Sequence, residues 1–207
     1  AIILVTNKMV PIEEIFTVIS AITTTGANVV PAHELATWKS SSLIILMVLM
    51  VIGGSSGSTV GGMKLIRVLT FLKSVDIGVT NAIAPKRVVT QRIAKKSFSE
   101  REMMEASSYI IIYLMILVIS WIIMMFFTHD PINTLFDVTS TIGNVGLSTG
   151  IINGDLDTIP KILLIFLMWI GRLEILPVLI TFRLGIDTFA QSLKIIKRSL
   201  KRKIQSI

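Results

Sequence analysis

The sequence has no cysteine and only two histidines among its 207 residues, and only 16% of its residues are charged. The absence of cysteine excludes disulfide bonds, thiolate metal sites and cysteine nucleophiles. His33 and His129 lie at the edges of separate apolar segments rather than as a ligand pair, so a zinc site is not expected. Because 52% of the residues are hydrophobic and the mean hydropathy is +0.78, the scarcity of charge indicates a membrane protein rather than a disordered chain.

Two long apolar runs, residues 109–127 and 159–182, would be difficult to bury in a water-soluble domain and predict helices that enter a lipid bilayer. Sixteen of the twenty basic residues lie in two segments, 64–101 and 183–203, whereas the connection 128–158 holds four aspartates and neither Lys nor Arg. The positive-inside rule then places the basic segments in the cytoplasm and the acidic connection outside. We interpret the net charge of +7 as topology and lipid headgroup contact, because the basic segments have almost no aromatic residues for stacking on nucleic-acid bases.

The sequence repeats itself at an offset of 120 residues. PIEEIFTVISAITTTG at residues 11–26 matches PINTLFDVTSTIGNVG at residues 131–146 at seven of sixteen positions without a gap. A second match follows at an offset of 118, where LMVIGG at 49–54 aligns with LMWIGR at 167–172. The chain therefore contains two copies of one unit, which consists of a short helix starting at a proline, a turn of Thr, Asn and Gly, and a longer apolar helix carrying glycine.

The first helix of each copy is too short to cross a membrane. Residues 12–22 would form a helix of roughly 16 Å, against a hydrocarbon core of about 30 Å. Pro11 suits a first helical position, and Asp130 is the expected N-cap before Pro131. Such a helix must end inside the membrane, where irregular backbone is tolerated only within protein or beside a wet cavity.

The turn after each short helix is a candidate cation site. Free carbonyl oxygens beside the negative end of a helix favour a cation, and small residues allow those oxygens to face inward. For a single copy, an ordinary helix capped by glycine would be the preferred interpretation. Two copies at matched spacing favour a re-entrant pore helix followed by a selectivity filter.

The segment GGSSGSTVGG at residues 53–62 carries five glycines in ten residues, which a lipid-facing helix does not tolerate. We expect it to line a cavity, and a flexible loop below a filter is a candidate gate. A phosphate-binding P-loop does not fit, because Met63 rather than glycine precedes Lys64. Two alternatives stay open: a loose turn between helices, and an intramembrane hydrolase using Ser55 or Ser56, for which a histidine within another span is lacking.

Arg172 lies near the centre of the last apolar run, with Glu174 two residues later. Ionisable residues at membrane depth face the protein interior or a water path. Residues two apart point to different sides of a helix, so we expect Arg172 to face a pore and Glu174 to hold a neighbouring element. Pro177 is expected to kink the helix just below.

At this point three motifs, TTTGAN, GGSSGSTVGGMK and MWIGRLEI, resemble the third and fourth repeats of the Trk/Ktr superfamily of potassium-transporting membrane subunits. The GRLE run is closer to the Trk branch, and the resemblance covers about residues 11–182. It implies an all-α membrane protein of helix, re-entrant pore helix, helix repeats, four of which surround one potassium pathway. It also implies a homodimer of such subunits and a cytoplasmic nucleotide-binding regulatory subunit.

The resemblance also divides the chain. Residues 1–72 would form the third pore repeat, with its outer helix mostly absent and residues 1–5 as the end of a truncated helix rather than a signal peptide. Residues 73–105 would be a cytoplasmic basic linker, 106–182 the fourth pore repeat and 183–207 a cytoplasmic basic tail. Because the family carries four repeats, we expect a fragment that requires the missing first two pore repeats to complete a pore.

Carried over by position, the resemblance implies two groups of functional residues. The potassium-binding residues would be Thr24, Thr25, Gly26, Ala27 and Asn28 in one filter strand and Asn144, Val145, Gly146, Leu147 and Ser148 in the other. Within them, carbonyl oxygens of Thr24, Thr25, Asn144 and Val145 would bind K⁺. The gating residues would be Gly53, Gly54, Gly57, Ser58, Thr59, Gly61, Gly62, Lys64 and Arg172.

The expected function is therefore potassium uptake across the cytoplasmic membrane, with K⁺ as the transported ligand and no covalent cofactor. Membrane lipid is an expected partner and nucleic acid is not, and no enzymatic reaction is expected. The alternative is a secondary transporter of a small solute that binds at broken helices, although such a protein has no need of two short pore helices in the same orientation.

Overall fold

A computed structural model describes residues 11–54, 61–83, 92–93, 96–97, 99–173, 181 and 184. The chain divides into two units, Ala1–Arg172 and Leu173–Ile207, and the following description concerns the first. Its elements in chain order are α2 (Pro11–Ile22), α3 (Ala32–Ala36), α4 (Ser40–Ile52), α5 (Leu65–Ile83), β1 (Arg92–Ile93), β2 (Lys96–Ser97), α6 (Glu100–Met125), α7 (Pro131–Ile142) and α8 (Thr158–Leu173). The all-α prediction is confirmed; the two-residue strands β1 and β2 form a small antiparallel hairpin that the sequence analysis did not predict.

The two short helices begin and end where the repeat predicted. α2 and α7 each have 12 residues and each begin at the proline. At the start of α7, the carboxylate of Asp130 accepts hydrogen bonds of 3.2 Å from the backbone N–H groups of Ile132 and Asn133, as expected of an N-cap. The proline ring fixes the first helical φ, and the cap satisfies two N–H groups that lack a helical partner.

α4 ends at the predicted glycine break, and the chain then returns to the end of the same helix. The N–H of Met63 donates a 2.8 Å bond to the Val51 carbonyl, and the N–H of Leu65 donates a 3.1 Å bond to the Gly54 carbonyl. These bonds satisfy carbonyls that a helix terminus leaves open. As a result, α5 begins beside the point where α4 ends.

The helices on either side of the predicted basic linker, residues 73–105, extend into that segment. α5 continues to Ile83, and α6 begins at Glu100 rather than near residue 106. α6 starts at a capping box, in which Ser99 Oγ accepts from the Glu102 N–H at 3.2 Å and the Ser99 N–H donates to the Glu102 carboxylate at 2.8 Å. Charged residues on the exposed side of a helix do not end it, so a basic segment can be partly helical.

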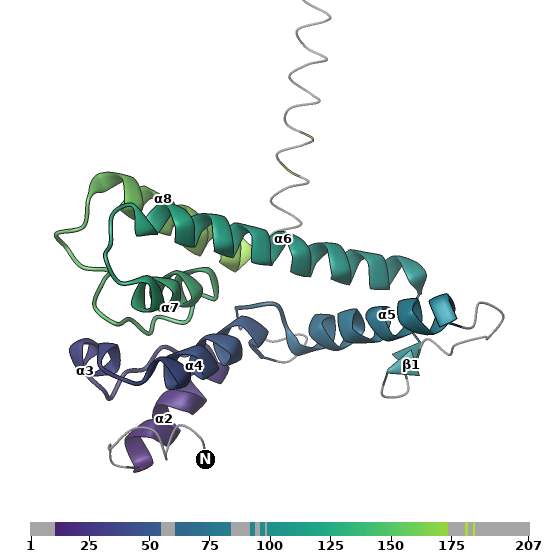
Figure 1. Ribbon diagram of the computed structural model, residues 1–207, viewed down its shortest axis with the longest axis horizontal. Coiled ribbons are helices and arrows are strands. Elements are labelled where there is room, and N and C mark those ends of the chain that lie inside the picture. Colours follow the sequence, from purple (N-terminus) through teal and green to yellow (C-terminus); the bar gives the residue numbers. More distant parts are fainter. Residues whose placement is uncertain are drawn as a thin grey trace, which may run out of the picture. The chain divides into compact units, whose positions relative to one another are not determined.

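α5 and α6 pack side by side (Figure 1). The guanidinium of Arg67 on α5 lies over the ring of Tyr109 on α6, 4.2 Å from the ring centroid. A cation over an aromatic face in a low-dielectric setting is favourable. The described residues include one helix long and apolar enough to cross a membrane, Arg101–Met125 of α6, within which an 18-residue window has a mean hydropathy of 2.4.

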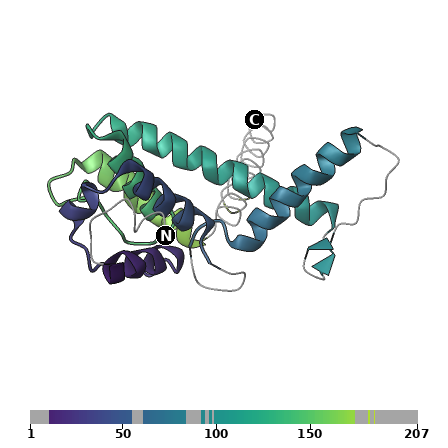
Figure 2. The same cartoon turned by 60° about the horizontal axis from the view of Figure 1, so that its bottom comes forward.

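The core joins the two repeats. α4 packs against α2 and α7, and α7 also packs against α6. Figures 1 and 2 both show α2 at the edge of this arrangement, beside α4 and away from α6. The buried core is formed by apolar side chains of α2, α3, α4 and α7 and of the segments that follow α2, α3 and α7, namely Ala21, Val30, Leu35, Trp38, Leu43, Leu46, Met47, Met50, Phe136, Val145 and Leu147.

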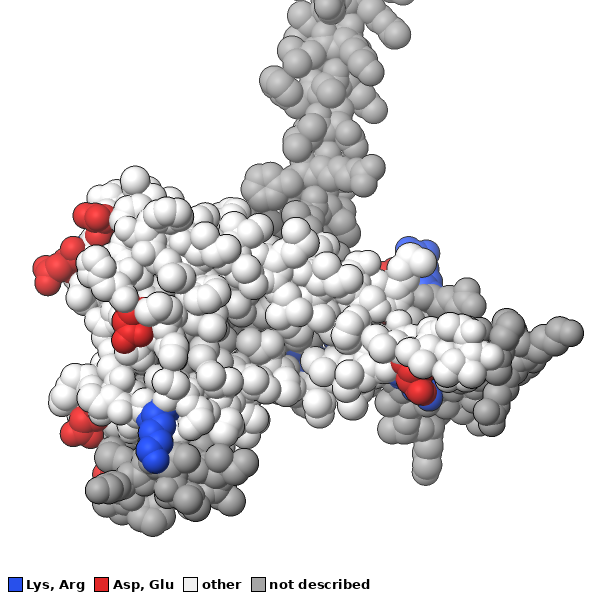
Figure 3. All heavy atoms as spheres, viewed as in Figure 1, with Lys and Arg blue, Asp and Glu red and all other residues white. Residues whose placement is uncertain are grey.

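Charged side chains are rare along the middle of the face shown in Figure 3, where white atoms cover most of α4 and α6. Many large apolar side chains on the described helices are exposed, including Ile111, Met115 and Ile119 on α6. In water such an apolar surface would be unfavourable, whereas hydrocarbon is as apolar as these side chains.

Candidate functional site

The turns after α2 and α7, called here the first filter turn (residues 23–28) and the second filter turn (residues 143–148), have the same backbone hydrogen bonds. In each, three successive N–H groups bond back to the last turn of the preceding helix. The bonds in the first are Thr23 to Ile19 (2.9 Å), Thr24 to Ala21 (3.3 Å) and Thr25 to Ser20 (3.1 Å); those in the second are Gly143 to Thr139 (3.0 Å), Asn144 to Thr141 (3.1 Å) and Val145 to Ser140 (2.9 Å). Every donor and acceptor in one set is 120 residues from its counterpart, so the internal repeat is a repeat of conformation.

The two turns also share their unusual dihedral angles. Thr24 and Asn144 have φ of 47° and 50°, and Gly26 and Gly146 have φ of 70° and 99°. The left-handed region is disfavoured for residues with a Cβ and accessible to glycine. These positive φ values occur at the same two positions of each turn and change the direction of the chain at the end of each short helix.

The two filter turns meet at their glycines. A Cβ on Gly26 would overlap the carbonyl oxygen of Val145, and a Cβ on Gly146 would lie 3.6 Å from Gly26 Cα. The backbones of residues 120 positions apart in the chain are therefore in direct contact at the carboxyl ends of α2 and α7. Both helix ends carry the negative end of the helix dipole, so this point favours a cation over an anion.

The second filter turn is anchored in the core, and the first is not. Val145 and Leu147 are buried beneath α4, while Gly146 between them is exposed. Thr25, Ala27 and Asn28 of the first turn are all exposed. A side-chain hydrogen bond also connects the first turn to α2, because the hydroxyl of Ser20 donates to the Ala27 carbonyl at 2.8 Å.

The glycine loop (residues 53–62) reaches both filter turns. The N–H of Gly61 donates a 3.3 Å bond to Thr24 Oγ1 in the first turn. A Cβ on Gly61 would overlap the carbonyl oxygen of Gly143 at the start of the second turn. Gly53 and Gly62 pack against each other at the base of the loop, and Lys64 at its end has a φ of 64°. The predicted gating residues Gly57, Ser58 and Thr59, and the alternative nucleophiles Ser55 and Ser56, lie outside the described residues.

α8 contacts the second filter turn from the other side. Asn144 donates a 3.1 Å side-chain hydrogen bond to the Met168 carbonyl, and a Cβ on Gly171 would overlap the Ile142 carbonyl oxygen and lie 2.6 Å from Asn144 Nδ2. Glycine at this position allows the backbone of α8 to approach the end of α7. Arg172 follows directly and is exposed. Glu174 and Pro177 lie outside the described residues.

The described site residues lie close together, because both filter turns, the loop end at Gly61 and α8 at Gly171 meet at the carboxyl ends of the short helices. No group of three or more carboxylate or imidazole side chains in the described ranges could hold a metal ion. The groups that converge on this region are mainly backbone carbonyls and hydroxyls, which are hard oxygen ligands.

Sequence reasoning missed two residues of this region. Gly171 stood in a quoted motif without an assigned role. Asp137 was counted among the acidic residues of an external connection, yet it lies buried in the middle of α7 and accepts hydrogen bonds from the segment after the second filter turn. The available signal was the repeat itself, since a carboxylate in α7 replaces Thr17 of α2.

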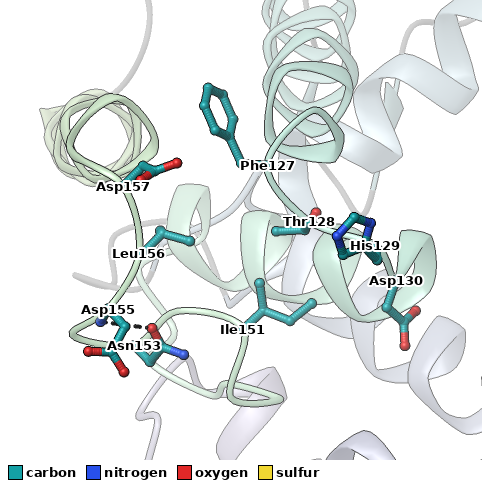
Figure 4. A pocket seen from close by; sticks show the side chains of 9 residues that line it. All are labelled: Phe127, Thr128, His129, Asp130, Ile151, Asn153, Asp155, Leu156 and Asp157. Atoms are coloured by element: carbon teal, nitrogen blue, oxygen red, sulfur yellow. Dashed lines mark hydrogen bonds between the residues drawn. The ribbon is translucent and has the colours of Figure 1, made fainter.

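A pocket of about 430 Å³ opens near the start of α7, between the end of α6 and the loop that leads to α8 (Figure 4). Its lining includes three aspartates, Asp130, Asp155 and Asp157. The pocket lies at the opposite end of α7 from the filter turn, on the side that the charge pattern predicts to be external. Its negative charge would attract cations.

Comparison with known protein families gives a match to TrkH, described as a cation transport protein, over residues 8–191. The chain is 33% identical over 198 residues to an uncharacterized cation transporter of Methanocaldococcus jannaschii, which covers 95% of this chain and 40% of that protein. It is 31% identical over 171 residues to the Trk system potassium uptake protein TrkH of Halomonas elongata, covering 81% and 35%. The crystal structure of the potassium transporter TrkH from Vibrio parahaemolyticus superimposes with a TM-score of 0.70 at 27% identity, covering 82% of this chain and 36% of that one. The chain thus spans between a third and two fifths of the length of these relatives.

Proposed function

Because the chain belongs to the TrkH family of cation transport proteins, a family of membrane transporters and not of enzymes, we propose that it forms part of a potassium pathway across the cytoplasmic membrane. In this proposal K⁺ sheds its water and binds to backbone oxygens of the two filter turns. The carbonyls of Thr24, Thr25, Asn144 and Val145 are the proposed ligands. Selectivity over sodium would rest on the number, spacing and field strength of those carbonyls.

The observation that carries this proposal is the contact between the two filter turns. Two short helices with the same bounds, the same terminal hydrogen bonds and the same positive φ pattern direct their carboxyl ends to one point, where Gly26 and Gly146 meet. A pore whose filter is built from repeated turns requires such convergence.

We further propose that the chain supplies the third and fourth of four pore repeats, and that the other two repeats cover α2. Every residue of α7 from Phe136 to Ile142 is buried. α2, in contrast, exposes Ile12, Ile15 and Ile19 on one face. The exposed apolar face of α2 and the exposed first filter turn are where the two further pore repeats would pack.

The proposed gate consists of the glycine loop and Arg172. The described end of the loop contacts both filter turns through Gly61. Arg172 follows the residue at which α8 touches the end of α7. Movement of either element would change access to the filter from the side on which the pore helices end.

The proposed orientation places the basic linker and the basic tail in the cytoplasm and the acidic pocket outside. By resemblance to the family, we propose a homodimer and a cytoplasmic nucleotide-binding regulatory subunit as partners. The basic segments would face that subunit and the anionic lipid headgroups.

The test is the reversal potential of the complete four-repeat transporter in a bilayer with opposed K⁺ and Na⁺ gradients, for the wild type and for Gly146→Ser. We expect a wild-type potential near potassium equilibrium that moves toward zero in the variant. The matched control is Gly78→Ser on α5, where an added side chain meets no atom within 4 Å. A selective potential unmoved by Gly146→Ser would remove this glycine from the filter, and saturable solute uptake without current would favour a secondary transporter.

A further inference from the structure

Asp137 is a buried carboxylate in the middle of α7, with 1% of its surface exposed. Its Oδ1 accepts from the Thr149 N–H at 2.7 Å and from Thr149 Oγ1 at 3.0 Å. Its Oδ2 accepts from Ser148 Oγ at 2.9 Å and from the Ile152 N–H at 3.2 Å. Both oxygens therefore bind two donors each, and a buried charge satisfied in this way holds its partners firmly.

All four donors come from residues 148–152, the segment that begins at the last residue of the second filter turn. The carboxylate thus binds this segment to the back of the pore helix. Thr149 makes a further contact with the same helix, through its hydroxyl and the Asn133 carbonyl at 3.4 Å. The second filter turn is therefore held at its last residue by Asp137 and within the turn by the core contacts of Val145 and Leu147.

The first repeat lacks this attachment. The counterpart of Asp137 is Thr17, whose hydroxyl donates to the Glu13 carbonyl of its own helix at 2.8 Å. The counterparts of Ser148 and Thr149 are Asn28 and Val29, which are exposed. The two filter turns have the same backbone shape but are held by different means.

We propose that Asp137 is a positioning residue that sets the spacing of the carbonyl oxygens in the second filter turn, and thereby the preference for K⁺ over Na⁺. This inference rests on the proposed function. Asp137 does not contact the ion in this account; it acts through Ser148 and Thr149. Carbonyl spacing distinguishes ions that differ little in size only if the backbone is held in place, and four hydrogen bonds from one rigid helix provide such support.

An alternative role, attraction of cations by the negative charge alone, fits the geometry less well. Asp137 is buried, and its oxygens face backbone N–H and hydroxyl donors rather than a cavity. Those donors offset its charge locally. A role in charge attraction predicts a change in conductance at constant selectivity, whereas the positioning role predicts a change in selectivity.

The test compares Asp137→Asn with Ser148→Ala and Thr17→Val in the complete transporter, by reversal potentials under K⁺ and Na⁺ gradients. Asn keeps the shape but replaces an acceptor oxygen with an NH₂ group that faces donors. We expect the permeability ratio of K⁺ to Na⁺ to fall about tenfold in Asp137→Asn and by a smaller factor in Ser148→Ala, which removes one donor. Thr17→Val, in the repeat without the attachment, should keep the wild-type ratio.

Membrane protein levels and total cation current are measured for each variant, so that a folding defect is recognised by loss of both. If Asp137→Asn fails to reach the membrane, Ser148→Ala and Thr149→Val, each of which leaves the carboxylate in place, decide the question. An unchanged ratio in those variants, or in a well-expressed Asp137→Asn, would overturn the inference. A wild-type protein without potassium selectivity would instead overturn the proposed function, so the two failures are distinguishable.

Discussion

Gly61 and Gly143 are in backbone contact, with no room for a Cβ on Gly61 beside the Gly143 carbonyl oxygen. Gly61 belongs to the glycine loop after α4, and Gly143 begins the second filter turn. The contact therefore joins the proposed gate of one repeat to the proposed filter of the other. Any side chain at Gly61 must move one of them.

Gly61→Ala is expected to separate the glycine loop at Gly61 from the end of α7, because the added methyl group would overlap the Gly143 carbonyl oxygen. Overpacking of this kind costs about 1–3 kcal/mol. If the loop restricts passage, potassium flux should rise while the reversal potential stays near the wild-type value. The measurement is ⁸⁶Rb⁺ or K⁺ uptake into proteoliposomes containing the complete transporter. Gly78→Ala on α5 serves as the control, and equal flux in Gly61→Ala and the wild type would contradict a gating role for the loop.

Arg172→Ala is expected to raise potassium flux with little change in selectivity. In the proposed pathway a cation at Arg172 would repel K⁺, and its removal would lower that barrier without moving the filter carbonyls. Uptake rate and reversal potential are recorded together. A variant whose flux equals that of the wild type would count against Arg172 as a barrier, and a variant with lost selectivity would place Arg172 in the support of the filter.

Gly171→Ala, unlike Arg172→Ala, is expected to change selectivity. The added methyl group would overlap the Ile142 carbonyl and crowd Asn144 Nδ2, so α8 must move away and the bond from Asn144 to the Met168 carbonyl is lost. Because Asn144 is a proposed ligand residue, the ratio of K⁺ to Na⁺ permeability should fall. Normal selectivity in a variant with normal expression would show that α8 does not support the second filter turn.

Neutralising Asp155 and Asp157 together, by substitution with Asn, is expected to lower potassium conductance at low ionic strength. Both side chains line the pocket at the start of α7 and are exposed, so their field is screened by salt, with a Debye length of about 30 Å at 0.01 M and about 3 Å at 1 M. Conductance of the variant and the wild type should converge as potassium concentration rises. A deficit of the same size at all concentrations would indicate a structural effect rather than ion attraction.

The repeat in the sequence was sufficient to predict the short helices to the residue, because proline marks the first turn of each and the small-residue turns mark the ends. It also identified Gly26 and Gly146 as equivalent, and the structure brings them together. The roles of these residues in ion binding stay predictions.

Two features were not predicted. The start of α6 has a local signal, the capping box at Ser99 and Glu102, which the sequence analysis did not use. Asp137 was assigned to the outside because it lies in a stretch without Lys or Arg. Its burial follows from the packing of α7 against α4 and α6, which is a tertiary property.

The unequal enclosure of α2 and α7 bears on how such a pore would be assembled during synthesis. α7 packs against α4 and α6, and its filter turn contacts α8, so the described neighbours of the second filter turn include helices of the same repeat. α2 packs mainly against α4, and Ile12, Ile15 and Ile19 on it are exposed. In the proposed four-repeat pore, this face of α2 would pack against the first two repeats, which are synthesised before it, and the surroundings of α7 would be completed last, when α8 enters the membrane.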